Sequence, residues 1–347
     1  MSTGEGRPAL APADVGPLVA RFGVDAEGLE FDDLPAYDDL NLRIKTAAGR
    51  RYVLKVHNAE LNSGSRARLE AQDRFIGRLA ERGLPVPEVI ISPSSSSSII
   101  PLDPPAPGRA APLARLLTYL EGDIVPNETP KDEAFLQRVG MLVGKVTAAL
   151  AGFEDPAAHW SWEWDMKIVP KTVRSKLSFI KDEAHRELAT RLADEYEATV
   201  CEAASTLPHS IIHSDLNDTN LLFRDNEVVG VLDFGDSIYS CTIFDCAIAA
   251  GYYSLGQADP MMVLTEVLRG YMRTAPSPPS AAELAVYFQA ARGRLLLSVA
   301  CSAEACFHKP DDEYLAHTAE PGWAALAKLA AVPKAEAMST FAAVASG

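Results

Sequence analysis

Two short stretches of the chain carry side chains that could transfer a phosphoryl group. Residues 211–223 contain Asp215 and Asn220, and residues 232–236 contain Asp233. One carboxylate can orient an attacking hydroxyl, while an amide oxygen and a second carboxylate can hold the magnesium ions that neutralise phosphates. Because apolar runs flank both stretches, we expect each to be a short strand that ends in a polar turn. These residue types predict phosphoryl transfer with Mg²⁺.

The spacing of the same residues indicates their individual roles. His213, Asp215 and Asn220 follow the His-x-Asp-x4-Asn pattern of kinase catalytic loops, and residues 233–235 read Asp-Phe-Gly, the metal-binding signature downstream of it. We predict Asp215 as the catalytic base and Asn220 and Asp233 as metal ligands. Each residue alone is more often part of a turn, so the combined pattern carries the prediction.

Four neighbouring residues are candidates for structural or substrate-binding roles: His213, Asp218, Asp236 and Asp245. We expect His213 to brace the metal-binding turn by a hydrogen bond rather than to transfer a proton. Asp245, on the helix predicted after the metal motif, is expected to accept hydrogen bonds from the catalytic-loop backbone. Asp236 directly follows the metal turn, so it either faces solvent or receives a substrate ammonium group.

A lysine and a glutamate upstream could hold the nucleotide. Lys55 lies near the end of a strand predicted over 51–57, and Glu70 lies 15 residues later in a helix predicted over 65–82. Protein kinases hold the α- and β-phosphates with such a pair. A lone strand lysine is more often solvated, but the downstream pattern favours the nucleotide-binding role.

The elements around these residues predict an α+β chain with two parts. Residues 1–121 combine a five-stranded antiparallel sheet with one main helix, and residues 122–347 are mostly helical. The first part has helices over 11–22 and 65–82, strands over 29–31, 41–46, 51–57, 85–92 and 112–120, and a Ser/Pro-rich loop over 92–108. The second part has helices over 135–150, 171–206, 242–255, 260–273, 281–307 and 313–329.

Composition restricts the partners. A net charge of −15 argues against nucleic acid and anionic membrane surfaces, and weakly favours a cationic substrate. The chain has five cysteines without a C-x-x-C pair, which indicates a reducing compartment. Residues 1–8 lack the features of a secretory leader, and no apolar run is long enough to span a membrane. We therefore expect a cytoplasmic protein.

Several features of protein kinases are missing. Residues 34–41 read Leu-Pro-Ala-Tyr-Asp-Asp-Leu-Asn where a glycine-rich phosphate loop would stand, and no Ala-Pro-Glu segment follows the metal motif. Asn217 and Asp218 also replace the residues that a protein kinase has after its catalytic Asp. The missing loop and the missing segment favour a small-molecule acceptor over a protein.

With these motifs in view, the chain resembles the aminoglycoside phosphotransferase and choline kinase superfamily, whose members have a two-lobed protein-kinase-like fold. Within it, the chain is most similar to the hydroxylysine kinases, on the residues at 37–41, 52–56, 115–120, 213–220 and 232–236. The resemblance implies Asp215 as base, Asn220 and Asp233 as Mg²⁺ ligands, and Lys55 with Glu70 as phosphate clamp. Ser214 stands where the family usually has Gly, and a negative φ would accommodate it.

The resemblance also implies a reaction. Hydroxylysine kinases are described as transferring a phosphoryl group from GTP to the side-chain hydroxyl of 5-hydroxylysine. ATP stays open as the donor, and homoserine, ethanolamine, choline or an aminoglycoside stay open as acceptors. An inactive nucleotide-binding module is the alternative from another class, although the four residues Lys55, Asp215, Asn220 and Asp233 are all present.

Overall fold

The chain folds into two compact units, Met1–Glu121 and Gly122–Gly347. The structure is a computed structural model that describes residues 8–36, 38–58, 65–309 and 319–346. Three sets of residues that enter the predictions lie outside the described residues: 1–7 of the N-terminal segment without leader features, Tyr37, and 313–318 of the last predicted helix. No helix in the described ranges is both long and apolar enough to cross a membrane.

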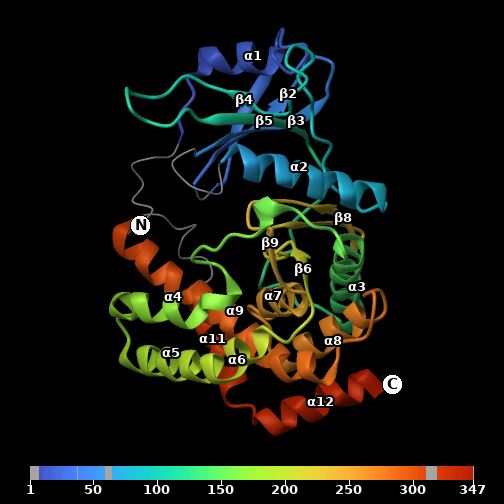
Figure 1. Cartoon of the computed structure of the whole chain (residues 1–347), viewed down its shortest axis with the longest axis vertical. Coiled ribbons are helices and arrows are strands. Elements are labelled where there is room, and N and C mark those ends of the chain that lie inside the picture. The colour runs from blue at the N-terminus through green and yellow to red at the C-terminus, as the bar shows by residue number, and fades with distance from the viewer. Residues whose placement is uncertain (1–7, 37, 59–64, 310–318, 347) are drawn as a thin grey trace. The chain divides into compact units, whose positions relative to one another are not determined.

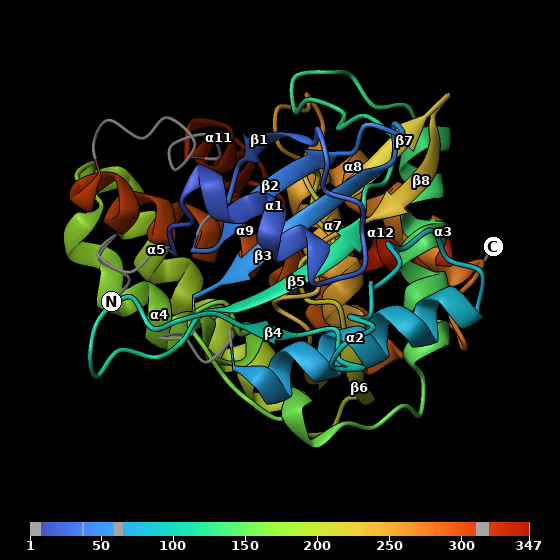
Figure 2. The ribbon, with the colours of Figure 1, turned by 90° about the horizontal axis from the view of Figure 1, so that it is seen from above.

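The first unit (Figure 1) contains a five-stranded antiparallel sheet, whose strand order β1-β2-β3-β5-β4 can be followed in Figure 2. Its strands are β1 (Glu30–Leu34), β2 (Leu40–Lys45), β3 (Arg51–His57), β4 (Ile100–Pro101) and β5 (Leu113–Thr118). The turn from β2 to β3 contains Gly49 at φ 78°, a left-handed conformation that glycine adopts without a steric clash. The predicted α+β class with a five-stranded sheet is confirmed.

The fourth strand differs from the one predicted. Over residues 85–92 the prediction of a strand is wrong, because this segment forms only isolated bridges, one of them from Val89 to β5. The fourth strand is instead the two-residue β4, which lies inside the segment 92–108 that we predicted as a loop. Two prolines near the start of the segment 85–92 lack the backbone N–H that regular pairing requires.

Helices cover both faces of this sheet. Helix α1 (Pro12–Ala20) packs on one face, against alternate residues of β2, β3 and β5 (Figure 2). Helix α2 (Arg66–Glu81) lies on the opposite face (Figure 1). Arg115 of β5 contacts α2, and Lys55 is its partner across the β3–β5 pair, so Lys55 points to the α2 side of the sheet.

The second unit is mostly helical, as predicted. Its main helices are α3 (Glu133–Leu150), α4 (Val169–Lys176), α5 (Glu183–Tyr196), α7 (Ile243–Tyr253), α8 (Pro260–Met272), α9 (Ala281–His308), α11 (Ala319–Ala330) and α12 (Lys334–Ser346). The single helix predicted over 171–206 is wrong, because a 3-10 turn at Leu177–Phe179 ends α4 before Asp182 caps α5. The cap forms where the Asp182 carboxylate accepts the His185 N–H at 2.8 Å.

Two small sheets bring the predicted catalytic and metal-binding turns together. Strand β6 (His209–Ile212) pairs with β9 (Ile238–Cys241), and β7 (Leu221–Arg224) pairs with β8 (Glu227–Val231). The segment 213–220 joins β6 to β7, and the segment 232–237 joins β8 to β9. Because both pairs are antiparallel, the two connections lie at the same strand ends, and the Leu232 N–H donates to the Asn220 carbonyl at 2.8 Å.

Candidate active site

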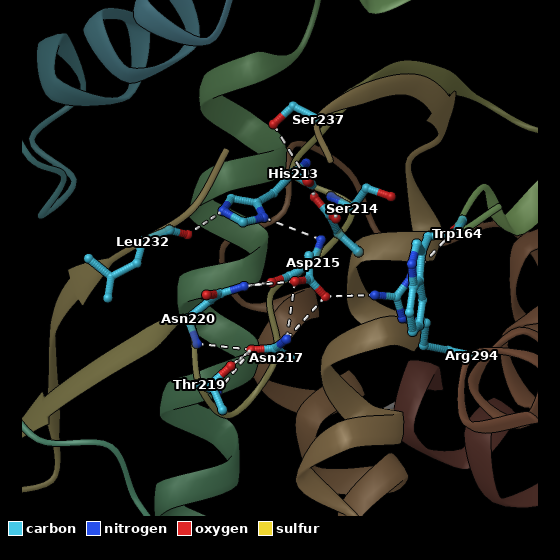
Figure 3. Close-up of polar contacts among 11 residues, drawn as sticks. Trp164, His213, Ser214, Asp215, Asn217, Thr219, Asn220, Leu232, Ser237 and Arg294 are labelled. Carbon is cyan, nitrogen blue, oxygen red and sulfur yellow. Dashed lines mark hydrogen bonds and ion pairs between the residues drawn. The ribbon is translucent and has the colours of Figure 1, made fainter. Parts of the chain in front are cut away.

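The Asp215 carboxylate is held by three side chains (Figure 3). Oδ1 accepts hydrogen bonds from Arg294 Nη2 at 2.6 Å and from Asn217 Nδ2 at 3.1 Å. Oδ2 accepts from Asn217 Nδ2 at 3.1 Å and from Asn220 Nδ2 at 2.8 Å. Burial raises the pKa of Asp215. Because 20% of its side chain is exposed, a ligand can still reach the carboxylate.

Asn217 organises the turn that carries Asp215, a role that the sequence analysis did not assign. Its Oδ1 accepts the backbone N–H groups of Thr219 and Asn220, both at 2.9 Å, while its amide nitrogen faces Asp215. Asn and Asp side chains commonly form such turns by bonding to the backbone two or three residues further on. Asn217 therefore fixes the loop shape and the direction of the carboxylate together.

His213 and Asp245 support the two turns from behind. The backbone N–H of Asp215 reaches His213 Nδ1 at 3.3 Å, and His213 Nε2–H donates to the Leu232 carbonyl at 2.9 Å, next to the metal motif. Burial lowers the pKa of His213 to about 4, so its ring is neutral at pH 7. The buried Asp245 carboxylate accepts the N–H groups of His213 and Ser214 at 2.9 and 2.7 Å.

Ser214 has a left-handed backbone, so the negative φ that would accommodate a serine is not the one it adopts. Its φ is 68°, where a side chain with a Cβ is strained by about 1–2 kcal/mol. The hydrogen bond from its N–H to Asp245 helps to hold this conformation. The loop therefore keeps the geometry for which Gly is usual, at a cost in stability.

Replacing Ser214 by Gly is expected to raise the free energy of unfolding by roughly 0.5–1 kcal/mol. Glycine removes the strain, although part of the gain is offset by its greater freedom in the unfolded chain. Urea denaturation measures the effect. Ser214→Ala is the matched control, because it removes only the hydroxyl, keeps the Cβ and should give no gain. A lower stability of the Gly variant than of the Ala variant would contradict the role of strain.

Asn220 and Asp233 present oxygen atoms that suit Mg²⁺. The Asn220 amide nitrogen bonds to Asp215, which leaves its Oδ1 for another partner. Asp233 is exposed and its Oδ1 accepts the Gly235 N–H at 3.0 Å. Among the described residues, no cluster of three or more His, Cys, Asp or Glu side chains could hold a metal. Mg²⁺ at nucleotide sites commonly takes one or two carboxylates together with phosphate and water oxygens, so the pair fits.

The remaining two predicted acids lie in different surroundings. Asp218 is buried. Burial lowers the pKa of Lys131, and the negative charge of Asp218 partly opposes this shift. Asp236 is partly buried, and its charge acts on Arg294. Asp236 therefore has Arg294 as a neighbour in common with Asp215.

Arg294 is the main residue that sequence reasoning missed. It lies on α9 and is almost fully buried, with its guanidinium stacked on Trp164 (Figure 3) and ion-paired with Asp215. Burial lowers its pKa, but Tyr252, Asp215 and Asp236 raise it by more, so the pKa stays above its ordinary value. The sequence contains one signal for this role: Arg294 is followed directly by Leu-Leu-Leu in a predicted helix, which indicates a buried position. A buried charge needs a partner of opposite charge.

In the first unit the structure does not bring Lys55 and Glu70 together. Glu70 is exposed on α2, and its ion pair is with Arg66 at 3.8 Å. The acid of α2 that faces the sheet is Asp73, whose carboxylate accepts from Arg115 Nη1 at 2.7 Å. The role of Lys55 in nucleotide binding stays a prediction, without Glu70 as its clamp partner.

A series of hydrogen-bonded, mostly buried side chains beside Lys55 links this sheet to α2. His57 Nδ1 lies 2.7 Å from Asp39 Oδ2, and Arg115 Nε donates to His57 Nε2 at 3.1 Å. Because an arginine nitrogen only donates, Nε2 must accept, and His57 is neutral with its proton on Nδ1. Burial lowers the pKa of His57, in agreement with this tautomer.

The buried His57 predicts a loss of stability in mild acid. Its pKa in the folded protein is below the ordinary value of 6.5, so the unfolded chain binds its proton more tightly. Stability should fall as the pH falls below about 6.5, by up to about 1.4 kcal/mol per pH unit for this one group. Urea denaturation between pH 7 and pH 5 should show a smaller decline for His57→Gln. Equal slopes in the variant and the wild type would refute the assignment.

Comparisons of sequence relate the chain to known phosphotransferases. Residues 34–284 match the phosphotransferase enzyme family. Hydroxylysine kinase of Mus musculus is 28% identical over 359 residues, which span 95% of this chain and 93% of that protein. Hydroxylysine kinase of Bos taurus is 28% identical over 93% of this chain and 92% of its own length. Homoserine kinase of Methylocella silvestris is 28% identical over 64% of this chain and 61% of that protein.

Solved structures agree with the fold. A microcompartment-associated aminopropanol kinase superposes with a TM-score of 0.64 at 16% identity, covering 92% of this chain and 97% of that one. An amicoumacin kinase gives a TM-score of 0.63 at 17% identity, covering 89% and 88%. The protein-kinase-like fold is thereby confirmed. Because the family match spans most of the chain, this chain belongs to the phosphotransferase enzyme family and is an enzyme that transfers phosphoryl groups to hydroxyl acceptors.

Proposed function

We propose that this enzyme transfers the γ-phosphoryl group of GTP or ATP to the side-chain hydroxyl of 5-hydroxy-L-lysine. Asp215 receives the acceptor hydroxyl, because its carboxylate is both held in place and partly exposed. The acceptor assignment rests on one observation, the similarity to hydroxylysine kinases along more than nine-tenths of both chains.

The nucleotide is proposed to bind with Mg²⁺. Asn220 Oδ1 and the Asp233 carboxylate would hold the ion, which neutralises phosphate charge when bound. Lys55, on the α2 side of the sheet, would donate to phosphate oxygens. Burial acts to raise the pKa of Asp39, but its neighbours, among them His57 and the charge of Lys55, together lower it by more. Lys55 therefore lies near the Asp39–His57 pair.

Asp236 is proposed to receive the ε-ammonium group of the acceptor. The hydroxyl and the ε-ammonium of 5-hydroxylysine are on adjacent carbons, so the acid that binds the ammonium must lie close to Asp215. In support of this, Asp236 belongs to the 232–237 connection, which is hydrogen-bonded to the turn that carries Asp215, and both charges act on Arg294. We also propose a cytoplasmic location, because all five cysteines are free thiols.

The test combines nucleotide binding with a panel of acceptors. Mg-GTP or Mg-ATP should raise the melting temperature, and release of nucleoside diphosphate should then depend on the acceptor. We expect kcat/KM for 5-hydroxylysine to exceed that for homoserine, ethanolamine, choline and an aminoglycoside by at least roughly tenfold. Lysine is the matched control, because it keeps both ammonium groups and lacks the hydroxyl, so it should inhibit without being phosphorylated.

Each other outcome has a definite meaning. Stabilisation by neither nucleotide would contradict the kinase proposal and favour another role for the fold. Binding without turnover of any acceptor would favour an inactive nucleotide-binding module. Turnover of homoserine alone would move the acceptor to the substrate named for the Methylocella silvestris relative.

A further inference from the structure

Besides pairing with Asp215, the guanidinium of Arg294 contacts two aromatic rings and a backbone carbonyl. Its side chain is 2% exposed. The guanidinium carbon lies 4.9 Å from the ring centre of Trp164 and 5.3 Å from that of Tyr252, and Nη1 donates to the Trp164 carbonyl at 3.4 Å. Aromatic faces attract the cation and restrict its plane. Arg294 is therefore a rigid donor, unlike a flexible surface arginine.

This rigid donor acts on one oxygen of the predicted base. Arg294 Nη2 reaches Asp215 Oδ1 at 2.6 Å, the shortest of the hydrogen bonds to that carboxylate, while the two asparagines come from the same loop as Asp215. A contact from α9 is the one that ties the carboxylate to the helical core. Without it, Asp215 would be positioned only by the turn that carries it.

We propose that Arg294 is a positioning residue for phosphoryl transfer, which holds the Asp215 carboxylate in the orientation that receives the acceptor hydroxyl. Trp164 and Tyr252 act through Arg294 by fixing its plane. This inference rests on the proposed function, because it assigns Asp215 to the acceptor. Misplacement of a reacting group by about 1 Å can lower a rate by roughly 10²-fold, so loss of this contact should be visible in kcat.

The same helix offers a matched control. Arg292 is 5% exposed at its side chain, lies against the Phe288 ring at 5.1 Å and pairs with Glu195 at 2.9 Å. It thus shares burial, an aromatic neighbour and a carboxylate partner with Arg294. A general cost of replacing a buried arginine on α9 would affect both positions, whereas a positioning role affects only Arg294.

The experiment compares Arg294→Lys, Arg294→Met and Arg292→Lys in the full chain, with Mg-nucleotide and the acceptor that gives the highest turnover. Lysine keeps the charge but not the planar donor geometry. We expect kcat to fall roughly 10–100-fold in Arg294→Lys and roughly 10²–10³-fold in Arg294→Met. KM for the acceptor and the nucleotide-induced melting shift should stay within about threefold, and Arg292→Lys should keep the wild-type kcat.

Two results would overturn the proposal. One is a kcat near wild type in Arg294→Lys with a raised acceptor KM, which would make Arg294 a binding residue. The other is an equal loss in Arg292→Lys, which would show a general packing effect.

A wild type without turnover on any acceptor would mean that the proposed function had failed. The positioning role is then decided by ¹³C NMR of the Asp215 carboxyl carbon, assigned with Asp215→Asn. Its resonance should move in Arg294→Lys and stay in Arg292→Lys. An unmoved resonance in both variants would reject the contact as a determinant of the carboxylate.

Discussion

Asp215→Asn is expected to lower kcat by about 10³-fold or more while leaving nucleotide binding close to wild type. The amide has nearly the shape of the carboxylate but cannot accept the hydroxyl proton. It would also turn an NH₂ group toward donors, because the carboxylate accepts from Arg294, Asn217 and Asn220. Both effects act on the step that needs the acceptor, and the residues proposed for the nucleotide are unchanged.

Two measurements separate these effects. Release of nucleoside diphosphate gives kcat, and the melting shift with Mg-nucleotide gives binding. Asp225→Asn is the control, because Asp225 is an exposed acid in the β7–β8 turn and its variant should keep full activity. A kcat within tenfold of wild type in Asp215→Asn would remove Asp215 as the base.

Gly140→Ala is expected to destabilise the second unit by about 3 kcal/mol or more, the upper part of the range for overpacked cores. A Cβ at Gly140 of α3 would lie 2.0 Å from the Val267 carbonyl oxygen of α8, and one at Gly270 would lie 2.1 Å from the Gln137 carbonyl oxygen. The two helices thus cross with their backbones in contact, and no flexible side chain can move aside.

The matched control for this substitution is Gly77→Ala on α2. A Cβ at Gly77 meets nothing within 4 Å, and alanine in an exposed helix position should add about 0.5–1 kcal/mol of stability. Urea denaturation compares both variants with the wild type. If Gly140→Ala is as stable as the wild type, the α3–α8 crossing is looser than described.

The residues of the two turns that form the candidate site could be selected from the sequence because their spacing is local. Strands β6, β7 and β8 are short apolar runs, so the polar residues between them are expected in the connecting turns. The bracing contacts of His213 and Asp245 lie where we predicted them. Their catalytic importance, like that of Asp215, stays a prediction.

Asn217, whose role was missed, lies in the same turn as Asp215, whereas Arg294 comes from another part of the chain. Arg294 lies 79 residues after Asp215, and no local pattern joins the two. Glu70 was chosen by distance from Lys55, but it directly follows the buried Leu69, and the 100° step per residue turns it away from the sheet. Asp73, one turn after Leu69, faces the sheet, so helical periodicity could have selected it.

Local backbone preferences do not decide the conformation where tertiary contacts override them. A serine disfavours positive φ, yet Ser214 adopts it because Asp245 holds its N–H. The 171–206 region has a helical pattern throughout, but the chain turns between α4 and α5. Propensity alone does not show where a helix must stop to pack on its neighbours.

The most direct measurement is the mass spectrum of 5-hydroxylysine after incubation with the wild-type enzyme, Mg²⁺ and GTP or ATP. We predict a product that carries one added phosphoryl group on the side-chain hydroxyl, and no such product with Asp215→Asn. Release of nucleoside diphosphate with 5-hydroxylysine left unmodified would contradict the proposed transfer.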